Sequence, residues 1–327
     1  MPVMKIFITG GAGFIGSNFC DSALTKGHEV VCFDDLSTGQ EFFLEEAKKN
    51  TKFQFVKGDI RNLDEIQKAV EEAKPDWVAH LAANADVRRG LEHPRKDLDV
   101  NTLGTWNVLE AAKSAGVKKI LFSSTSAAYG NPDIFPTPET APFPEQTSLY
   151  GASKAAGEGL VSAYCHGYGM AAVVFRFASI VGPRYTHGHV FDFVKKLKTD
   201  PTRLEILSDG NLPKSYVHVE DLMNGLWVTL DAVEAKTLDT LFNVFNIGHD
   251  TTLVIKDSAA LIAKKMGLTP ELHFTGGTGG WIGDHRVELD TSKLKALGWH
   301  TTHTIQEGIE DTVDYLMANP HLLKVRA

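Results

Sequence analysis

Three glycines, Gly10, Gly13 and Gly16, follow the first apolar run of this chain and open its first amphipathic stretch. The run over residues 5–9 predicts a buried strand, and the apolar spacing of residues 14–26 predicts a helix. In such a strand–turn–helix unit, the first glycine allows the tight turn, the second lets a pyrophosphate approach the backbone, and the third lets helix and strand pack closely. The chain is therefore expected to begin with a dinucleotide-binding βαβ unit.

Apolar strand-like runs alternate with helical spacing through the first half of the chain. The runs cover residues 30–33, 53–56, 77–81, 120–123 and 172–177, and the helical stretches cover 63–73, 96–115 and 149–167. Strands that are apolar nearly throughout are typical of a parallel sheet covered on both faces, and right-handed crossovers make it doubly wound. We expect an α/β protein in which residues 1–180 form a dinucleotide-binding Rossmann domain, with some later segments returning to it.

The pattern changes after Gly182. Strand-like pieces become shorter, and they are followed by two stretches with the spacing of amphipathic helices. The strand-like pieces are 204–207, 215–219 and 242–247, and the helical stretches are 252–266 and 306–317. We expect residues 181–327 to form mainly a smaller C-terminal α/β lobe that binds the substrate, and the proline-rich segment 131–146 to be an ordered loop over the site.

An acidic pair at the end of the second predicted strand bears on which dinucleotide binds. Asp34 lies about twenty residues after the glycine turn, where a carboxylate accepts the ribose hydroxyl groups. Asp34 and Asp35 would repel a 2′-phosphate, so NAD is expected rather than NADP. Asp59 and the small residues after the fourth strand are expected in the same site. The residues expected to bind NAD are Gly10, Gly13, Phe14, Ile15, Gly16, Asp34, Asp35, Ser37, Asp59, Ile60, Leu81, Ala82, Ala83, Asn101, Tyr150, Lys154 and Phe177.

Tyr150 and Lys154 are four residues apart in a predicted helix, so they share one of its faces. A free tyrosine keeps its proton at neutral pH, but a nearby ammonium and a positive nicotinamide ring favour the phenolate and lower the pKa of the phenol. Thr125, at the end of the fifth predicted strand, is expected to hydrogen-bond the same substrate oxygen. A surface helix pair is the alternative, but the preceding strands and glycine turn favour Thr125, Tyr150 and Lys154 as catalytic residues.

With these motifs in order, the chain resembles the extended short-chain dehydrogenase/reductase family, in its sugar-nucleotide epimerase/dehydratase branch. The resemblance covers nearly the whole length. It rests on Thr9-Gly10-x-x-Gly13-x-x-Gly16, His80-Leu81-Ala82-Ala83, Asn101, Ser123-Ser124-Thr125, Tyr150-x-x-x-Lys154, Ser215-Tyr216-Val217-His218-Val219 and Gly283-Asp284. It implies NAD held throughout the cycle, a nucleotide-sugar substrate, and a homodimer formed through the helices around 96–115 and 149–167.

The residues after Thr125 distinguish between the reactions of that branch. Similar dehydratases have Asp-Glu there, because removing water needs its own acid and base, and related decarboxylases have a glutamate two positions on. This chain has Ser126-Ala127-Ala128-Tyr129-Gly130. The resemblance thus favours epimerisation at C4 of a UDP-hexose through a transient 4-keto sugar. A nucleotide-sugar 2-epimerase, a UDP-uronic acid epimerase and a net oxidoreductase remain alternatives; a non-catalytic NAD-binding sensor is disfavoured, because the catalytic residues are retained.

Three positions depart from the pattern of UDP-galactose epimerases. Ser179 stands where they have an asparagine, Lys214 where they have a pyrophosphate-binding arginine, and no arginine directly precedes Gly283-Asp284. A lysine supplies the charge but not the bidentate fork, so Arg184 or Arg286 is expected to compensate. The residues expected to bind the substrate are Asn84, Thr125, Ser126, Ser179, Arg184, Lys214 and Arg286.

Composition bears mainly on partners and location. The net charge of −8, with no basic tail, argues against nucleic acid or an anionic membrane as a partner. The chain shows no signal-peptide layout and no apolar stretch long enough to span a bilayer, and its three scattered cysteines suggest reduced thiols, so a cytoplasmic location is expected. His187-Gly188-His189 has no carboxylate or thiol clustered with it, and no metal site is predicted.

Overall fold

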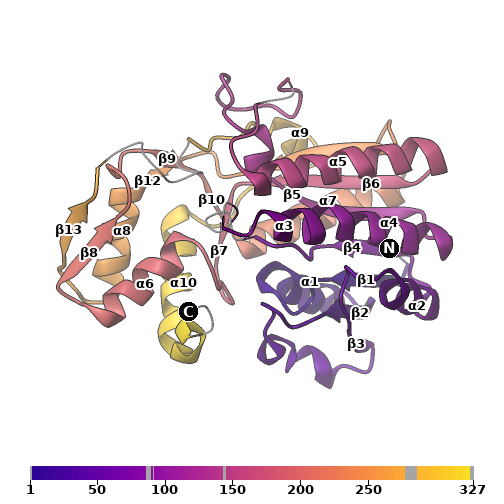
Figure 1. Cartoon of the computed structure of the whole chain (residues 1–327), viewed down its shortest axis with the longest axis horizontal. Coiled ribbons are helices and arrows are strands. Elements are labelled where there is room, and N and C mark those ends of the chain that lie inside the picture. Colours follow the sequence, from indigo (N-terminus) through magenta and orange to yellow (C-terminus); the bar gives the residue numbers. More distant parts are fainter. Residues whose placement is uncertain (1, 86–89, 91, 143–144, 277–285, 325–327) are drawn as a thin grey trace.

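The computed structural model describes residues 2–85, 90, 92–142, 145–276 and 286–324. Its centre is a seven-stranded sheet with the strand order β11-β6-β5-β4-β1-β2-β3 (Figure 1). All neighbouring strands in it are parallel, which confirms the predicted doubly wound Rossmann sheet. The strands are β1 (Lys5–Thr9), β2 (Glu29–Asp34), β3 (Phe53–Lys57), β4 (Trp77–His80), β5 (Lys119–Thr125), β6 (Ala171–Phe177) and β11 (Phe242–Ile247).

Helices cover both faces of this sheet. On one face α1 (Phe14–Thr25) packs against α7 (Val219–Glu234), and on the other face α4 (Gly104–Ser114) lies between α2 (Leu63–Ala73) and α5 (Leu149–Tyr168). Alternate side chains of β1 enter the two resulting cores, with Ile6 and Ile8 in one and Phe7 in the other. Burial on both faces explains why the strands are apolar at nearly every position.

The last strand of the sheet comes from far along the chain. Residues 242–247, predicted as part of the smaller lobe, form β11 and pair with β6 from Phe242↔Ala172 to Ile247↔Phe177. That placement from sequence was wrong. The reason is long-range: α7 packs across the face of the sheet and returns the chain to its edge, where Val244 and Phe245 join opposite cores.

The predicted helix over residues 96–115 is divided into three parts. Helix α3 (Pro94–Asp97) is followed by a π-helix, η3 (Leu98–Leu103), before α4 begins. The wider turn surrounds Asn101, which is buried, and whose carbonyl accepts a hydrogen bond from the Thr105 hydroxyl at 2.6 Å. The Asn101 side chain donates to Ser153 Oγ at 3.0 Å and so ties this segment to α5.

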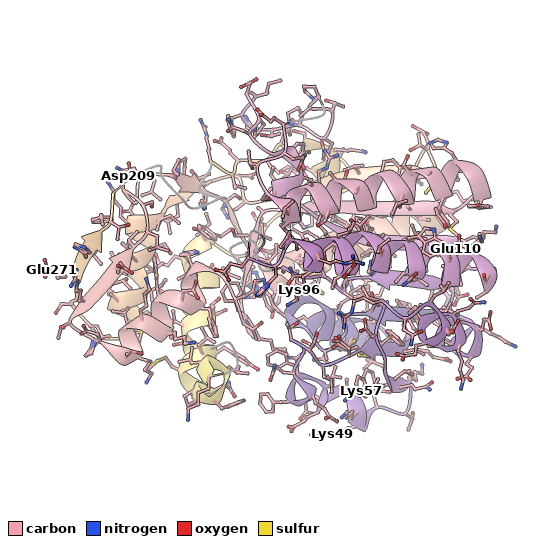
Figure 2. All side chains as sticks on the ribbon, in the orientation of Figure 1. Lys49, Lys57, Lys96, Glu110, Asp209 and Glu271 are labelled. Carbon is pink, nitrogen blue, oxygen red and sulfur yellow. The ribbon has the colours of Figure 1, made fainter. Side chains whose placement is uncertain are left out.

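The smaller lobe lies beside the carboxyl ends of the strands, and Figure 2 shows Asp209 and Glu271 at its outer edge. It contains three two-stranded pairs and several helices. Its elements are β7 (Ser179–Val181), α6 (His189–Thr199), β8 (Arg203–Ile206), β9 (Pro213–Lys214), β10 (Tyr216–His218), β12 (Leu253–Val254), α8 (Ile255–Lys265), β13 (Glu271–Phe274) and α10 (Ile305–Ala318). Helix α9 (Ser292–Lys295) packs instead against β11 of the main sheet (Figure 1). Short 3₁₀ turns are η1 (Glu41–Leu44), η2 (Ala47–Lys49), η4 (Ser126–Tyr129) and η5 (Pro320–Lys324). Within the described ranges, no helix combines the length and apolar character needed to cross a bilayer.

The described part of segment 131–146 is anchored by hydrogen bonds. The Thr137 N–H donates to the Glu288 carbonyl at 2.8 Å, and the Asn246 N–H donates to the Glu139 carboxylate at 2.8 Å. No described residue of this segment lines the main cleft. These contacts hold the described part of the segment against β11 and residues 288–290, and the expectation that the segment lies over the site stays a prediction.

Candidate active site

A cleft of about 1050 Å³ opens between the carboxyl ends of the Rossmann strands and the smaller lobe. Parallel strands present their carboxyl ends at one edge of a sheet, where ligands of such folds bind. One wall comes from the glycine turn and the ends of β4, β5 and β6, and the opposite wall comes from α6, β8 and β9. The predicted site residues that line it are Gly10, Gly13, Phe14, Ile15, Gly16, Leu81, Ala83, Thr125, Ser126, Tyr150, Lys154, Phe177, Ser179 and Lys214.

The glycine turn is shaped by close backbone contacts. Gly10 has φ +70°, and a Cβ atom there would lie 2.6 Å from the backbone of Ala82 on the neighbouring strand end. A Cβ at Gly16 would lie 2.1 Å from the Gly10 carbonyl oxygen. Gly13 is the N-cap of α1, and no side chain caps the first turn of that helix. Residues 13–16 at this end of α1 line the cleft, and the first N–H groups of a helix have no partner within the helix, which suits a pyrophosphate. The residues present therefore fit a bound dinucleotide.

Asp34 braces this turn from the end of β2. Its carboxylate accepts hydrogen bonds from the Ala12 N–H at 3.0 Å and from the Leu36 N–H at 2.8 Å. The side chain is buried, and desolvation raises the pKa of the Asp34 carboxyl. A carboxylate can accept about four hydrogen bonds, so the Asp34 carboxylate can accept about two more. We propose that it accepts these from the ribose hydroxyl groups of the dinucleotide.

Several other predicted residues do not line the cleft. Asp59 is held by Arg61, whose Nε donates to it at 2.8 Å, and that guanidinium lowers the pKa of the Asp59 carboxyl. The Asn84 side chain donates to Asp97 at 2.7 Å, and the Asn84 N–H donates to the Asn101 side chain at 2.8 Å. The other predicted cofactor residues outside the lining are Asp34, Asp35, Ser37, Ile60, Ala82 and Asn101.

Thr125 and Tyr150 meet at the floor of the cleft. Thr125 ends β5, and its hydroxyl accepts a hydrogen bond from the Ala127 N–H at 3.1 Å. Helix α5 starts at a capping serine, Ser148, which brings Tyr150 into its first turn. Burial raises the pKa of Tyr150 to about 12, while a hydrogen bond with Thr125 lowers it. The expected lowering of this pKa included the charge of a bound nicotinamide ring and stays a prediction, since among the protein groups alone desolvation outweighs the hydrogen bond.

Lys154 lies one helical turn after Tyr150 and is almost fully buried. Its ammonium donates to Ser123 Oγ at 3.5 Å and stands 4.5 Å from the centre of the Phe122 ring. Burial lowers the pKa of Lys154 to about 7, and Glu158 acts in the opposite direction. Nearby His80 is neutral, since burial lowers its pKa to about 3 and its two ring nitrogens bond to threonine hydroxyls.

Replacing Lys154 with methionine is expected to stabilise the cofactor-free protein most at pH 6, with the gain shrinking as the pH rises. The pKa of Lys154 is about 7 in the folded protein and near 10.5 in the unfolded chain. Between these pH values Lys154 is therefore protonated in the unfolded chain but not in the folded protein. The stability of the parent protein therefore rises with pH through this window, by at most about 1.4 kcal/mol per unit, whereas methionine does not titrate. Urea unfolding of both proteins between pH 6 and 10 measures the difference, and a difference independent of pH would contradict the expectation.

The predicted phosphate cations do not all reach the cleft. Arg184 Nη2 pairs with Asp21 of α1 at 2.6 Å, and Arg286 pairs with Glu288 and stacks on the Phe135 ring at 4.5 Å. Each guanidinium is thus held by a nearby carboxylate, and neither lines the cleft. Lys214 on β9 does line it. Gly283-Asp284 and the residues just before it lie outside the described residues.

Sequence reasoning missed most of the wall that faces the Rossmann sheet. Helix α6 was not predicted, although Asp192, Lys195, Lys196 and Thr199 recur at helical spacing beside an apolar stripe. These side chains line the cleft. Other lining residues that were not predicted include Thr38, Ser124, Ala127, Tyr185, Thr186, His187, His189, Arg203, Glu205 and Leu207.

A histidine cluster lies elsewhere, formed by His218, Glu220 and His303. His218 Nδ1 accepts a hydrogen bond from the Glu220 N–H at 3.2 Å, so the neutral ring carries its proton on Nε2. That nitrogen then has no lone pair for a metal ion. In the motif singled out earlier, His189 Nε2 is within 2.8 Å of Ser258 Oγ. Neither arrangement argues for a metal site.

The glycine turn and the Thr125–Tyr150–Lys154 set line the same cleft of a Rossmann sheet, which is the arrangement of a dinucleotide-dependent enzyme. The chain matches the NAD dependent epimerase/dehydratase family over residues 6–248, and it belongs to that family. This match confirms the family expected from the motifs and NAD as its cofactor.

Similar proteins with names support the same assignment. The chain is 34% identical over 319 residues to a UDP-glucose 4-epimerase from Mycolicibacterium smegmatis, covering 95% of this chain and 98% of that protein. The Thermus thermophilus UDP-glucose 4-epimerase, solved in complex with NAD, has a TM-score of 0.83 at 32% identity and covers 96% of this chain and 99% of its own. The Bacillus cereus UDP-glucuronic acid 4-epimerase, solved with UDP-glucuronic acid and NAD, has a TM-score of 0.85 at 27% identity, covering 97% and 100%.

Proposed function

We propose that this protein is an NAD-dependent nucleotide-sugar epimerase that acts at C4 of a UDP-hexose. The observation that carries the proposal is the cleft itself. Thr125, Tyr150 and Lys154 line it together, while the next positions, Ser126 and Ala127, line it without an acid. Dehydration would need an acid and a base of its own at those positions. Similar proteins that are named UDP-glucose 4-epimerase and UDP-glucuronate 4-epimerase support the same reaction.

In the proposed mechanism Tyr150, as the phenolate, removes the proton from the C4 hydroxyl group, and Thr125 hydrogen-bonds the same oxygen. The glycine turn of residues 10–16 would hold NAD, which when bound would supply the acceptor for the C4 hydride and the donor for its return to the opposite face of the sugar. Tyr150 then gives the proton back to the oxygen. The Lys154 ammonium stabilises the phenolate throughout, which makes the tyrosine a usable base near neutral pH. No net oxidation occurs, so no second substrate is needed.

Proton NMR of UDP-glucose incubated with the purified protein, without added NAD, tests this function. A growing anomeric signal of UDP-galactose would establish epimerisation at C4 with retained cofactor. No reaction of UDP-glucose, together with conversion of UDP-glucuronic acid, would move the proposal to uronic acids. Stoichiometric formation of NADH would instead indicate a net oxidoreductase.

Replacing Lys214 with methionine is expected to raise the KM for the nucleotide sugar roughly tenfold with little change in kcat, because a charged contact to phosphate contributes equally before and in the transition state. Lys214→Arg should keep the KM near that of the parent. The control is Lys68→Met, which removes an exposed lysine on α2. Initial rates over a range of substrate concentrations measure both constants, and an unchanged KM would remove Lys214 from the substrate site.

We also propose that the protein is a cytoplasmic homodimer that associates through η3, α4 and α5. Leu98, Leu103 and Trp106 are exposed by 47%, 45% and 39% on this segment, which is unusual for large apolar side chains so close together. Light scattering of the purified protein tests the assembly, and a mass of 35.8 kDa would contradict it.

A further inference from the structure

A buried ion pair lies behind the catalytic helix, and the mechanism above does not use it. Glu158 of α5 is paired with Arg176 of β6, with Arg176 Nη2 at 2.7 Å from Oε2 and Arg176 Nε at 3.0 Å from Oε1. The Ser124 hydroxyl donates a further hydrogen bond to Glu158. Both side chains are largely shielded, with 9% of the Glu158 side chain and 16% of the Arg176 side chain exposed.

Stability alone does not account for burying two charges here. Removing both charges from water costs several kcal/mol each, and well-packed apolar residues often replace such pairs without loss. Lys154 raises the same question. Among the described residues its ammonium forms no ion pair, and its close partners are the Ser123 hydroxyl and the Phe122 ring. The Lys154 ammonium would thus be a third buried charge. It has no counter-ion in contact, so burying it is costly unless a nearby negative charge offsets it.

Glu158 is placed to offset the charge of Lys154. The two residues are four apart on α5, so they share one face of the helix. Of the ion pair, the carboxylate is the member that acts on Lys154, and it raises the pKa of that lysine. Arg176 is held on its other sides by the Tyr129 ring, 4.5 Å from its guanidinium carbon, and by the Glu139 carbonyl, to which Nη1 donates at 3.2 Å. The pair therefore presents its negative member to Lys154.

Other titratable groups around Lys154 and Tyr150 do not supply this charge. His80 on β4 is neutral, and the phenol of Tyr129 keeps its proton because burial raises its pKa to about 12. Asp97 of α3 is a buried carboxylate, but it acts on Tyr150, whose pKa it raises. Glu139 lies beyond Arg176, where its carboxylate accepts from the Asn246 N–H.

We propose that Glu158 is a positioning residue that keeps Lys154 protonated during turnover, with Arg176 and Ser124 holding its carboxylate in place. This inference rests on the proposed function, since it gives Lys154 the task of stabilising the Tyr150 phenolate. It assigns a role in the reaction to a side chain outside the cleft.

Glu158→Gln tests the proposal through the pH dependence of kcat. Removing a negative charge favours loss of the protons of both Lys154 and Tyr150, so both limbs of the profile should move to lower pH. The alkaline limb, where Lys154 loses its charge, should move by about one unit. Glu158→Asp should keep the profile of the parent. A merely structural role would lower kcat at every pH without moving the limbs, and that result would overturn the proposal.

A matched control is Glu234→Gln. Glu234 of α7 is also largely shielded, pairs with Lys119 at the start of β5, and accepts from Trp77 Nε1 at 2.7 Å. It lies at the opposite end of the strand from Thr125. Its removal should lower stability and leave the pH profile in place. A shift equal to that of Glu158→Gln would overturn the proposal.

A second measurement avoids the substrate and covers the case in which Glu158→Gln leaves Arg176 unpaired and unfolds the protein. The double variant Glu158→Gln/Arg176→Gln removes both buried charges, which keeps the interior neutral. In cofactor-free protein, each protein is compared with its own Lys154→Met variant over a range of pH. The pH at which the stability of the lysine protein begins to rise relative to the methionine variant reports the pKa of Lys154. That onset should fall by about one unit in the double variant. An unchanged onset would overturn the proposal. A shifted onset, with a parent protein that converts no nucleotide sugar, would show that Glu158 acts on Lys154 but would reject the proposed function and with it the role in turnover.

Discussion

Replacing Tyr150 with phenylalanine is expected to lower kcat by about 10³-fold while the protein still binds NAD. Phenylalanine keeps the ring that fills the floor of the cleft but has no oxygen to take the proton of the sugar hydroxyl group. The phenol is placed for this role by Thr125, which shares a hydrogen bond with it, and by Lys154 one turn further on. Turnover is measured by NMR conversion of UDP-glucose, and NAD content by release on denaturation.

The control for this variant is Tyr164→Phe on the same helix. Tyr164 turns away from the cleft and hydrogen-bonds Glu110 of α4, so its hydroxyl has no access to a substrate. Its removal should leave kcat unchanged. Equal turnover by Tyr150→Phe and the parent would remove Tyr150 from the mechanism. If the Tyr150→Phe protein lost NAD, a fall in turnover would not report on proton transfer. That result would instead assign Tyr150 a role in holding the cofactor.

Replacing Gly16 with alanine is expected to yield a protein that is less stable by about 1–3 kcal/mol and that is purified without NAD. The added Cβ would lie 2.1 Å from the Gly10 carbonyl oxygen and 2.7 Å from Gly11 Cα. Both are backbone atoms of the turn itself, so no side chain can move aside to relieve the clash. The helix start must shift, and its free N–H groups then no longer meet at the pyrophosphate. Thermal unfolding and the NAD content of the purified protein measure the two effects.

Gly167→Ala is the matched control, because Gly167 is also helical but has no atom within 4 Å of an added Cβ. This change should leave NAD content unchanged and stabilise the protein by about 0.5–1 kcal/mol, since alanine loses less conformational freedom in a helix. A Gly16→Ala protein that retains NAD like the parent would show that the turn tolerates the shift, and the argument from close packing would fail.

Local sequence patterns predicted the Rossmann sheet and the wall of the cleft that it provides. The apolar runs reflect burial on both faces, and the glycine spacing reflects contacts between residues that are close in the chain, such as Gly10 and Gly16. The Tyr150–Lys154 pair could be read because helical spacing alone places both on one face. These features depend on short-range geometry.

The features that sequence reasoning missed depend on contacts between distant segments. Residues 242–247 join the main sheet because α7 returns them to the free edge of β6, which no local pattern reveals. Arg184 and Arg286 have the charge that a phosphate needs, but Asp21 and Glu288 hold them outside the cleft. Residues of α6 and β8 form one wall of the cleft. Their sequence pattern is that of an ordinary amphipathic helix and strand, so the pattern alone does not mark them as lining residues.

The sequence by itself determined the family and the cofactor, and it predicted the catalytic residues, because each prediction rests on residue types at short, regular spacing. Only the tertiary structure decided the electrostatics of those residues. Burial raises the pKa of Tyr150 and lowers that of Lys154, and the buried carboxylate that opposes the second shift, Glu158, is held by an arginine from a different strand. Desolvation and the distances between charges are properties of the packed interior, and they arise only when distant segments come together.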